Sequence, residues 1–115
     1  MAILSSHFLN GADGTHAGEV SVSVWLLSDS QERHLLFESK SKVDGRFEEE
    51  IPVDTDANYE MIVDTGAYFR ERAQEQSSLQ ICEKIVIRFR MPDPTRRYHI
   101  PIIISPNSYS CWWSS

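Results

Sequence analysis

Three residues spread along the chain could together perform acid–base chemistry on an anionic ligand: His7, Arg46 and His99. A histidine titrates near neutral pH, so it can take a proton from water or return one to a leaving group. A guanidinium is always charged and can bind an anion through two parallel hydrogen bonds. Taken alone, each histidine is more often a surface or hydrogen-bonded core residue, and an arginine after a turn is more often solvated. Residue type alone therefore does not distinguish a site from three unrelated positions.

The remaining histidines and the cysteines give no comparable signal. His16 and His34 lie in polar, turn-like surroundings and are interpreted as surface residues. Cys82 and Cys111 have no close spacing and make no zinc signature, so they are expected to be free thiols in a reducing compartment. We expect no metal and no organic cofactor.

Length and charge narrow the class of protein. The 115 residues, 1–115, are enough for one domain with one core. A net charge of −6 with scattered basic residues argues against binding nucleic acid. No apolar run approaches the roughly 18 residues needed to span a membrane, and no signal peptide or C-terminal Ser-Lys-Leu is visible. The expected location is the cytoplasm, with a peroxisomal location left open.

The elements that must position these residues are mostly short strands. Residues 20–26 alternate apolar and polar side chains, as a half-buried strand does. Further strand-like runs cover 34–37, 43–47 around a predicted Asp44-Gly45 hairpin turn, 59–63, 85–89, 98–104 with Pro101 inside it, and 109–113. Residues 67–76 favour one surface helix, capped by Asp64 or Thr65. The pattern predicts a mostly β fold, a sandwich of seven to eight strands with one short helix.

Four motifs in this order resemble one known family. They are Leu4-Ser5-Ser6-His7 near the start, Asp44-Gly45-Arg46 at the turn, Asp64 to Phe69 leading into the helix, and Tyr98-His99-Ile100-Pro101 with the Ile-rich run to Pro106. The chain is similar in these motifs, and over nearly its whole length, to the transthyretin-like 5-hydroxyisourate hydrolases of purine breakdown. The resemblance implies a two-sheet transthyretin-like sandwich.

The resemblance also implies a function for the three polar residues. In that family a homotetramer holds channel sites where two dimers meet, and both histidines and the arginine line the channel. The substrate is a small anionic heterocycle whose cyclic amide is opened by water. On this analogy His7 or His99 activates the water and Arg46 holds the substrate, and sequence alone does not say which histidine is the base.

The C-terminal tail departs from the family pattern. The hydrolases end in Tyr-Arg-Gly-Ser, whereas this chain ends in Trp112-Trp113-Ser114-Ser115. Ser115 is retained, and we count it among the candidate catalytic residues. Trp112 and Trp113 are candidate substrate-binding residues, although strand alternation argues that only one of them faces the channel. Arg97 and the Asn107-Ser108 turn replace a histidine and a Tyr-Gly pair that are usual in the family.

Three functions are compatible with these residues. The first is a 5-hydroxyisourate hydrolase with an unusual tail. The second is a family member diverted to a larger aromatic or heterocyclic substrate, such as a cyclase or isomerase of secondary metabolism. The third is a non-catalytic ligand-binding tetramer. Retention of both histidines and the arginine favours catalysis over carriage.

Overall fold

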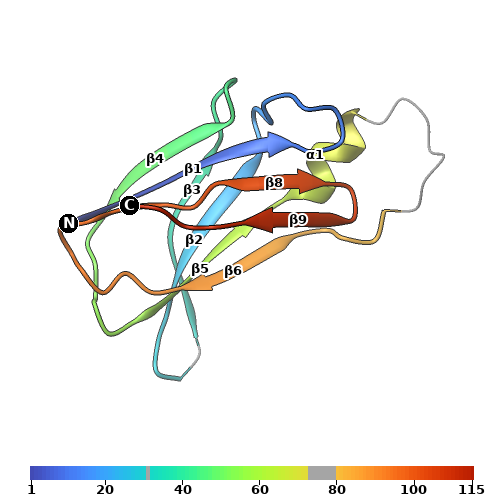
Figure 1. Ribbon diagram of the computed structural model, residues 1–115. Coiled ribbons are helices and arrows are strands. Elements are labelled where there is room, and N and C mark those ends of the chain that lie inside the picture. Colours follow the sequence, from blue (N-terminus) through green and yellow to red (C-terminus); the bar gives the residue numbers. More distant parts are fainter. Residues whose placement is uncertain (31, 73–79) are drawn as a thin grey trace.

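The protein is a sandwich of two β-sheets, seen in a computed structural model that describes residues 1–30, 32–72 and 80–115 (Figure 1). Within those ranges the elements are β1 (Ala2–Asn10), β2 (Ser21–Leu27), β3 (Arg33–Lys40), β4 (Arg46–Ile51), β5 (Asn58–Val63), α1 (Thr65–Arg72), β6 (Ile85–Phe89), β7 (Arg97–His99), β8 (Ile102–Ser105) and β9 (Ser108–Cys111). The predicted mostly β, two-sheet sandwich with one short helix is confirmed. The described residues form nine strands rather than seven or eight.

The first sheet has the order β4-β1-β8-β9, with β7 also paired to β1. β7 runs parallel to the first half of β1, and β8 runs parallel to its second half. The predicted strand 98–104 is therefore divided at Ile100-Pro101, because proline has no N–H to give to the ladder. The Ser6 hydroxyl donates a hydrogen bond of 2.6 Å to the Ile100 carbonyl at this break.

The second sheet has the order β3-β2-β5-β6, with every pair antiparallel. The predicted Asp44-Gly45 turn is present, and Lys42 N donates to the Arg46 carbonyl across it at 2.8 Å. The prediction that it joins a hairpin is wrong, because β3 before it belongs to the second sheet and β4 after it to the first. The turn therefore carries the chain from one sheet to the other.

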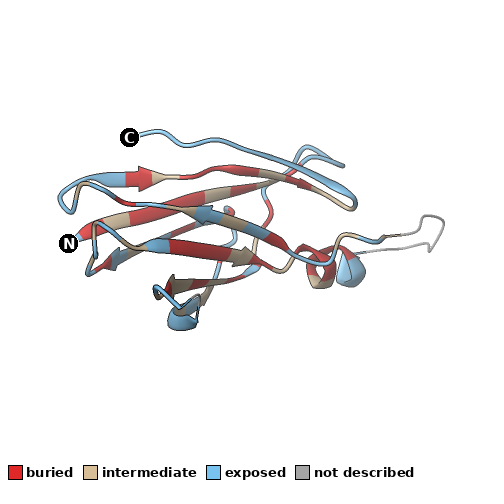
Figure 2. Ribbon diagram, turned by 90° about the horizontal axis from the view of Figure 1, so that it is seen from below, coloured by how far each residue is buried: buried red, intermediate tan, exposed pale blue. Residues whose placement is uncertain are grey.

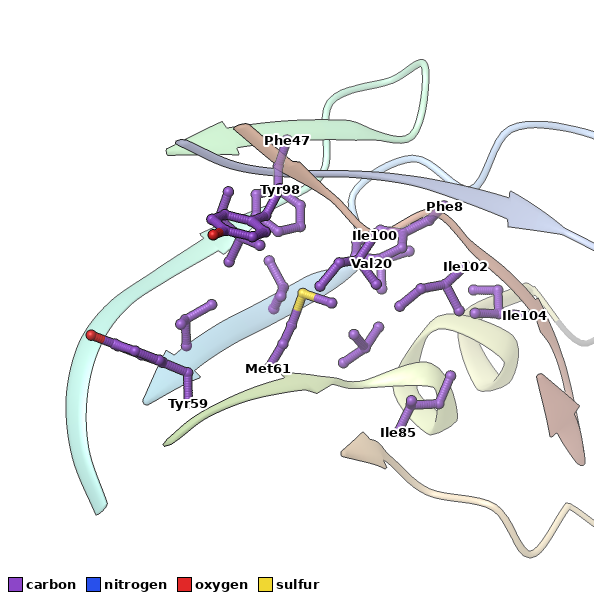
Figure 3. Packing of buried hydrophobic residues seen from close by; sticks show 14 of the residues in the cluster. Phe8, Val20, Phe47, Tyr59, Met61, Ile85, Tyr98, Ile100, Ile102 and Ile104 are labelled. Carbon is purple, nitrogen blue, oxygen red and sulfur yellow. The ribbon is translucent and has the colours of Figure 1, made fainter. Parts of the chain in front are cut away.

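The core lies between the two sheets (Figures 2 and 3). Phe8 of β1, Met61 of β5 and Ile102 of β8 are fully buried there. Burying side chains of this size stabilises the fold by about 1.5–3 kcal/mol each. On β1 the even-numbered side chains Leu4 and Phe8 point into this core, so the odd-numbered ones point to the outer face of the sheet.

The helix α1 begins at Thr65, two residues before the predicted start at Ala67, and one of the two predicted capping residues is in place. Asp64 Oδ1 accepts a hydrogen bond of 3.2 Å from the Ala67 N–H, which makes Asp64 the N-cap. Tyr68 and Phe69 are buried and fix α1 at one end of the sandwich, opposite the end where both chain termini lie (Figure 1). Residues 73–76 of the predicted helix lie outside the described residues.

The chain end is not a regular strand over its full predicted length. β9 ends at Cys111, two residues before the predicted end at Trp113. Beyond it, Ser114 forms an isolated antiparallel bridge with His99 of β7. The tail, residues 112–115, therefore runs beside β7 as irregular, solvent-exposed chain (Figure 2).

Candidate active site

Strand register gathers the three predicted site residues on the outer face of the first sheet. His7 on β1 lies directly opposite Arg46, the first residue of β4. His99 on β7 lies opposite Ser5, two residues before His7 on β1. Directly opposed residues in a sheet point to the same side, so all three side chains share the face that Ser5 and His7 occupy.

The His99 ring is held by a neighbour on β1. Ser5 Oγ lies 2.9 Å from His99 Nδ1. Burial is the main cause that lowers the pKa of His99 below its usual 6.5, and the positive charges of Arg46 and Arg97 lower it further. His99 is therefore a neutral imidazole at neutral pH, the form that can accept a proton. Since Ser5 occupies Nδ1, Nε2 is the ring nitrogen left to face a water molecule.

The His7 ring contacts a histidine that the sequence analysis assigned to the surface. His7 Nε2 lies 2.9 Å from His16 Nδ1, and the two rings stack with centroids 5.0 Å apart. The pKa of His7 is lowered, first by burial and then by the charge of Arg46. The backbone of Asp44 opposes this shift, and the smaller effects of His16 and of the Asp44 carboxylate lower and raise the pKa respectively. His16 is exposed as expected, but it belongs to the site by contact.

Arg46 is presented by the turn that precedes it. Gly45 has a φ of 84°, in the left-handed region that glycine tolerates. The Asp44 carboxylate accepts a hydrogen bond of 3.0 Å from the Arg46 backbone N–H. Among the described residues no carboxylate forms an ion pair with Arg46, whereas Arg97 on β7 is paired with Glu48. The Arg46 guanidinium is thus placed to bind an anion that comes from outside the chain.

The tail meets the site through its backbone. His99 N donates to the Ser114 carbonyl at 3.0 Å, and Ser114 N donates to the His99 carbonyl at 2.8 Å. Ser114 therefore shares the face of His99, a placement that the sequence analysis did not anticipate. Ser115 is exposed beside it.

Trp112 and Trp113 lie beside a groove of about 670 Å³ rather than beside the three polar residues. The groove lies between the tail and β6, and Tyr98 and Ile100 are among the residues that line it. The Trp113 ring packs against Tyr98 at 5.8 Å between centroids. Tyr98 faces the core side of its strand, so within one chain Trp113 is turned away from His99. The substrate-binding role of the two tryptophans stays a prediction.

The described residues offer neither a metal site nor a membrane-spanning helix. No group of three or more His, Cys, Asp or Glu side chains there could hold a metal ion. No helix among those residues is long and apolar enough to cross a membrane. Cys82 and Cys111 are free thiols, as the sequence analysis expected.

The fold and the site together define a transthyretin-like sandwich with a histidine and arginine site on the outer face of one sheet. The model of the HIUase/Transthyretin family matches residues 4–113, and the chain belongs to this family. This confirms the resemblance found from the four motifs.

Named relatives and solved structures agree with the assignment. A 5-hydroxyisourate hydrolase of Pseudomonas aeruginosa is 25% identical, over 100% of this chain and 93% of that protein. The structure of the Klebsiella pneumoniae 5-hydroxyisourate hydrolase has a TM-score of 0.79 and 26% identity, covering 100% of both chains. The crystal structure of (S)-allantoin synthase has a TM-score of 0.82 and 26% identity over 99% of this chain, which spans only 44% of that protein.

Proposed function

We propose that this protein is an enzyme that hydrolyses 5-hydroxyisourate, opening a cyclic amide with water. The observation that carries the proposal is the gathering of two histidines with lowered pKa and one cation, which forms no ion pair among the residues described by the structure, on a single face. Relatives named for this activity match almost the entire chain, which supports the same substrate.

His99 is the proposed base. With the ring hydrogen on Nδ1, donated to Ser5 Oγ, Nε2 is the nitrogen that can accept a proton from the attacking water. The water oxygen then bonds to the amide carbonyl carbon, and negative charge develops on the carbonyl oxygen. The C–N bond of the ring breaks when His99 returns the proton to the leaving nitrogen. No further reactant is needed to balance this step.

Arg46 is the proposed anion-binding residue. A guanidinium can hold the substrate anion with two hydrogen bonds and stabilise the charge that develops during attack. After burial, the charge of Arg46 is the next cause that lowers the pKa of each histidine ring. The same cation is therefore proposed to bind substrate and to add to the effect of burial in favouring the neutral form of both rings.

We also propose a homotetramer that acts in the cytoplasm. The site is on an outer face of one sheet, with Arg46 exposed, so a second surface is needed to shield the substrate and the attacking water from bulk solvent. A neighbouring subunit in the arrangement known for the family provides that surface. The two free thiols fit a reducing compartment.

The test is the ultraviolet decay of freshly generated 5-hydroxyisourate with wild-type protein, Arg46→Ala and His99→Ala. Each substitution should reduce kcat/KM at least about a hundredfold, as loss of a base or an electrostatic group does, and light scattering should show an unchanged assembly. His34→Ala, on exposed β3 of the other sheet, is the matched control and should retain activity. No acceleration by a folded wild-type assembly, or full activity in the Arg46 or His99 variant, would overturn the proposal.

A further inference from the structure

His16 is a polar residue of the site that the proposed reaction does not use. The loop after β1 returns the chain alongside that strand, and Leu9 and His16 form an antiparallel bridge. Asn10 N donates to the Thr15 carbonyl at 2.8 Å, and Ala17 N donates to the Phe8 carbonyl at 2.9 Å. Backbone pairing on both sides of His16 therefore fixes where its side chain begins.

The bridge also fixes the direction of the His16 side chain. Leu9 is odd-numbered on β1 and belongs to the outer face that carries His7. A residue bridged to Leu9 points to the same side, and His16 accordingly reaches the His7 ring. The contact is both a hydrogen bond between ring nitrogens and a stack of the two rings, with 28° between their planes. The backbone bridge between Leu9 and His16 therefore places the His16 ring against the His7 ring.

We infer that His16 is a positioning residue, which holds the His7 ring in the site and shares one proton with it. Two imidazoles joined through a nitrogen pair can hold one proton between them, whereas a second proton would place two positive charges in contact. Arg46 from β4 adds to that repulsion, while the backbone and carboxylate of Asp44 in the turn favour a proton on His7. The separation of 2.9 Å between the two ring nitrogens leaves room for one N–H between them.

The contact with His16 gives His7 and His99 different roles in the site. His16 occupies Nε2 of His7, while His99 has Ser5 on Nδ1 and keeps Nε2 for water. His7 then orients the substrate through a ring whose rotation is fixed. This catalytic consequence rests on the proposed function, but the pairing itself does not.

Side-chain nitrogen NMR of the histidines across pH tests the pairing without any substrate. His16→Phe keeps an aromatic ring for stacking but removes both nitrogens, and His16→Asn keeps a polar group close to the place of Nδ1. In His16→Phe the pKa of His7 should rise and its titration should become that of a single, uncoupled group. His16→Asn should keep the His7 ring in its wild-type tautomer. The matched control His34→Asn should leave the His7 titration unchanged.

Kinetics supply the second readout. If the wild-type protein hydrolyses 5-hydroxyisourate, His16→Phe should lose roughly ten- to a hundredfold in kcat, the scale of a misoriented group, and His16→Asn should recover most of it. An unchanged His7 titration in a folded His16→Phe protein would overturn the pairing, and unchanged kcat in an active enzyme would overturn the positioning role. A shifted His7 titration in a protein without hydrolase activity would support the pairing and overturn the proposed function alone.

Discussion

Gly45 links the turn before β4 to the geometry of the site, and Gly45→Ala should damage both. The φ of 84° is strained for alanine. A Cβ at this position would collide with the Phe8 carbonyl oxygen and would lie 3.2 Å from His7 Cδ2. Because the obstacle is backbone, β1 or the turn must move. That movement also weakens the hydrogen bond of 2.7 Å from Phe8 N to the Gly45 carbonyl.

The expected cost can be estimated from these two effects. Left-handed alanine costs about 1 kcal/mol, and a weakened buried hydrogen bond about 1–1.5 kcal/mol. We therefore expect Gly45→Ala to lower the free energy of unfolding by about 2–2.5 kcal/mol, or roughly 8–10 °C in Tm. Displacement of His7 and Arg46 should reduce kcat/KM on the order of a hundredfold.

Gly14 is the matched control for this substitution. It has a similar φ of 79°, but a Cβ there would meet nothing within 4 Å. Gly14→Ala should cost only about 1 kcal/mol and should retain activity. Urea unfolding at one fixed protein concentration, which keeps any subunit association constant, measures the difference. Equal losses of stability in the two variants would refute the argument that the close approach to Phe8 matters.

Four further predictions concern pH, the second sheet and the tail. The acid limb of kcat/KM should lie below pH 6.5, because His7 and His99 have lowered pKa values, and a limb above 6.5 would contradict this. Stability should also fall as pH drops below 6.5, since the unfolded histidines take up protons first. Glu60→Gln should lower the free energy of unfolding by about 1–3 kcal/mol with activity retained, because the buried Glu60 carboxylate binds Arg33 and Arg88 on the other sheet; unchanged urea unfolding would contradict it. Trp113→Arg should raise turnover of 5-hydroxyisourate by returning a cation to the tail, and unchanged turnover would leave Trp113 with only its packing on Tyr98.

Much of the local structure could be predicted because nearby residues cause it. Asp64 precedes a run of good helix formers, and its carboxylate caps α1. Asp44 and Gly45 form a tight turn because one side chain binds the backbone ahead and the other residue accepts a positive φ. The alternation of residues 20–26 matches β2 because one of its faces is solvated. These effects act between residues that are close in sequence, so they can be predicted from short segments of the chain.

The strand β1 and the partner of His7 illustrate what the sequence analysis missed. On β1, Ser5 and Ser6 are both buried, one on each face, because each binds a partner on or beside β7. These two buried serines interrupt the alternation of apolar and polar residues by which β1 could have been recognised in the sequence. A signal for His16 did exist. Residues 10–14, Asn-Gly-Ala-Asp-Gly, are typical of a turn, and pairing the residues on either side of that turn as a hairpin would have placed His16 near His7.

The sequence by itself determined the candidate residues, through four motifs, and the turns and cap that local chemistry fixes. Only the tertiary structure decided that the Asp44-Gly45 turn joins two different sheets, because pairing partners are chosen by the burial of whole strands. The same global pairing aligns β4 and β7 on either side of β1 and so brings Arg46 and His99 to one face with His7. Register between distant strands is a property of the assembled core, and no short stretch of sequence contains it.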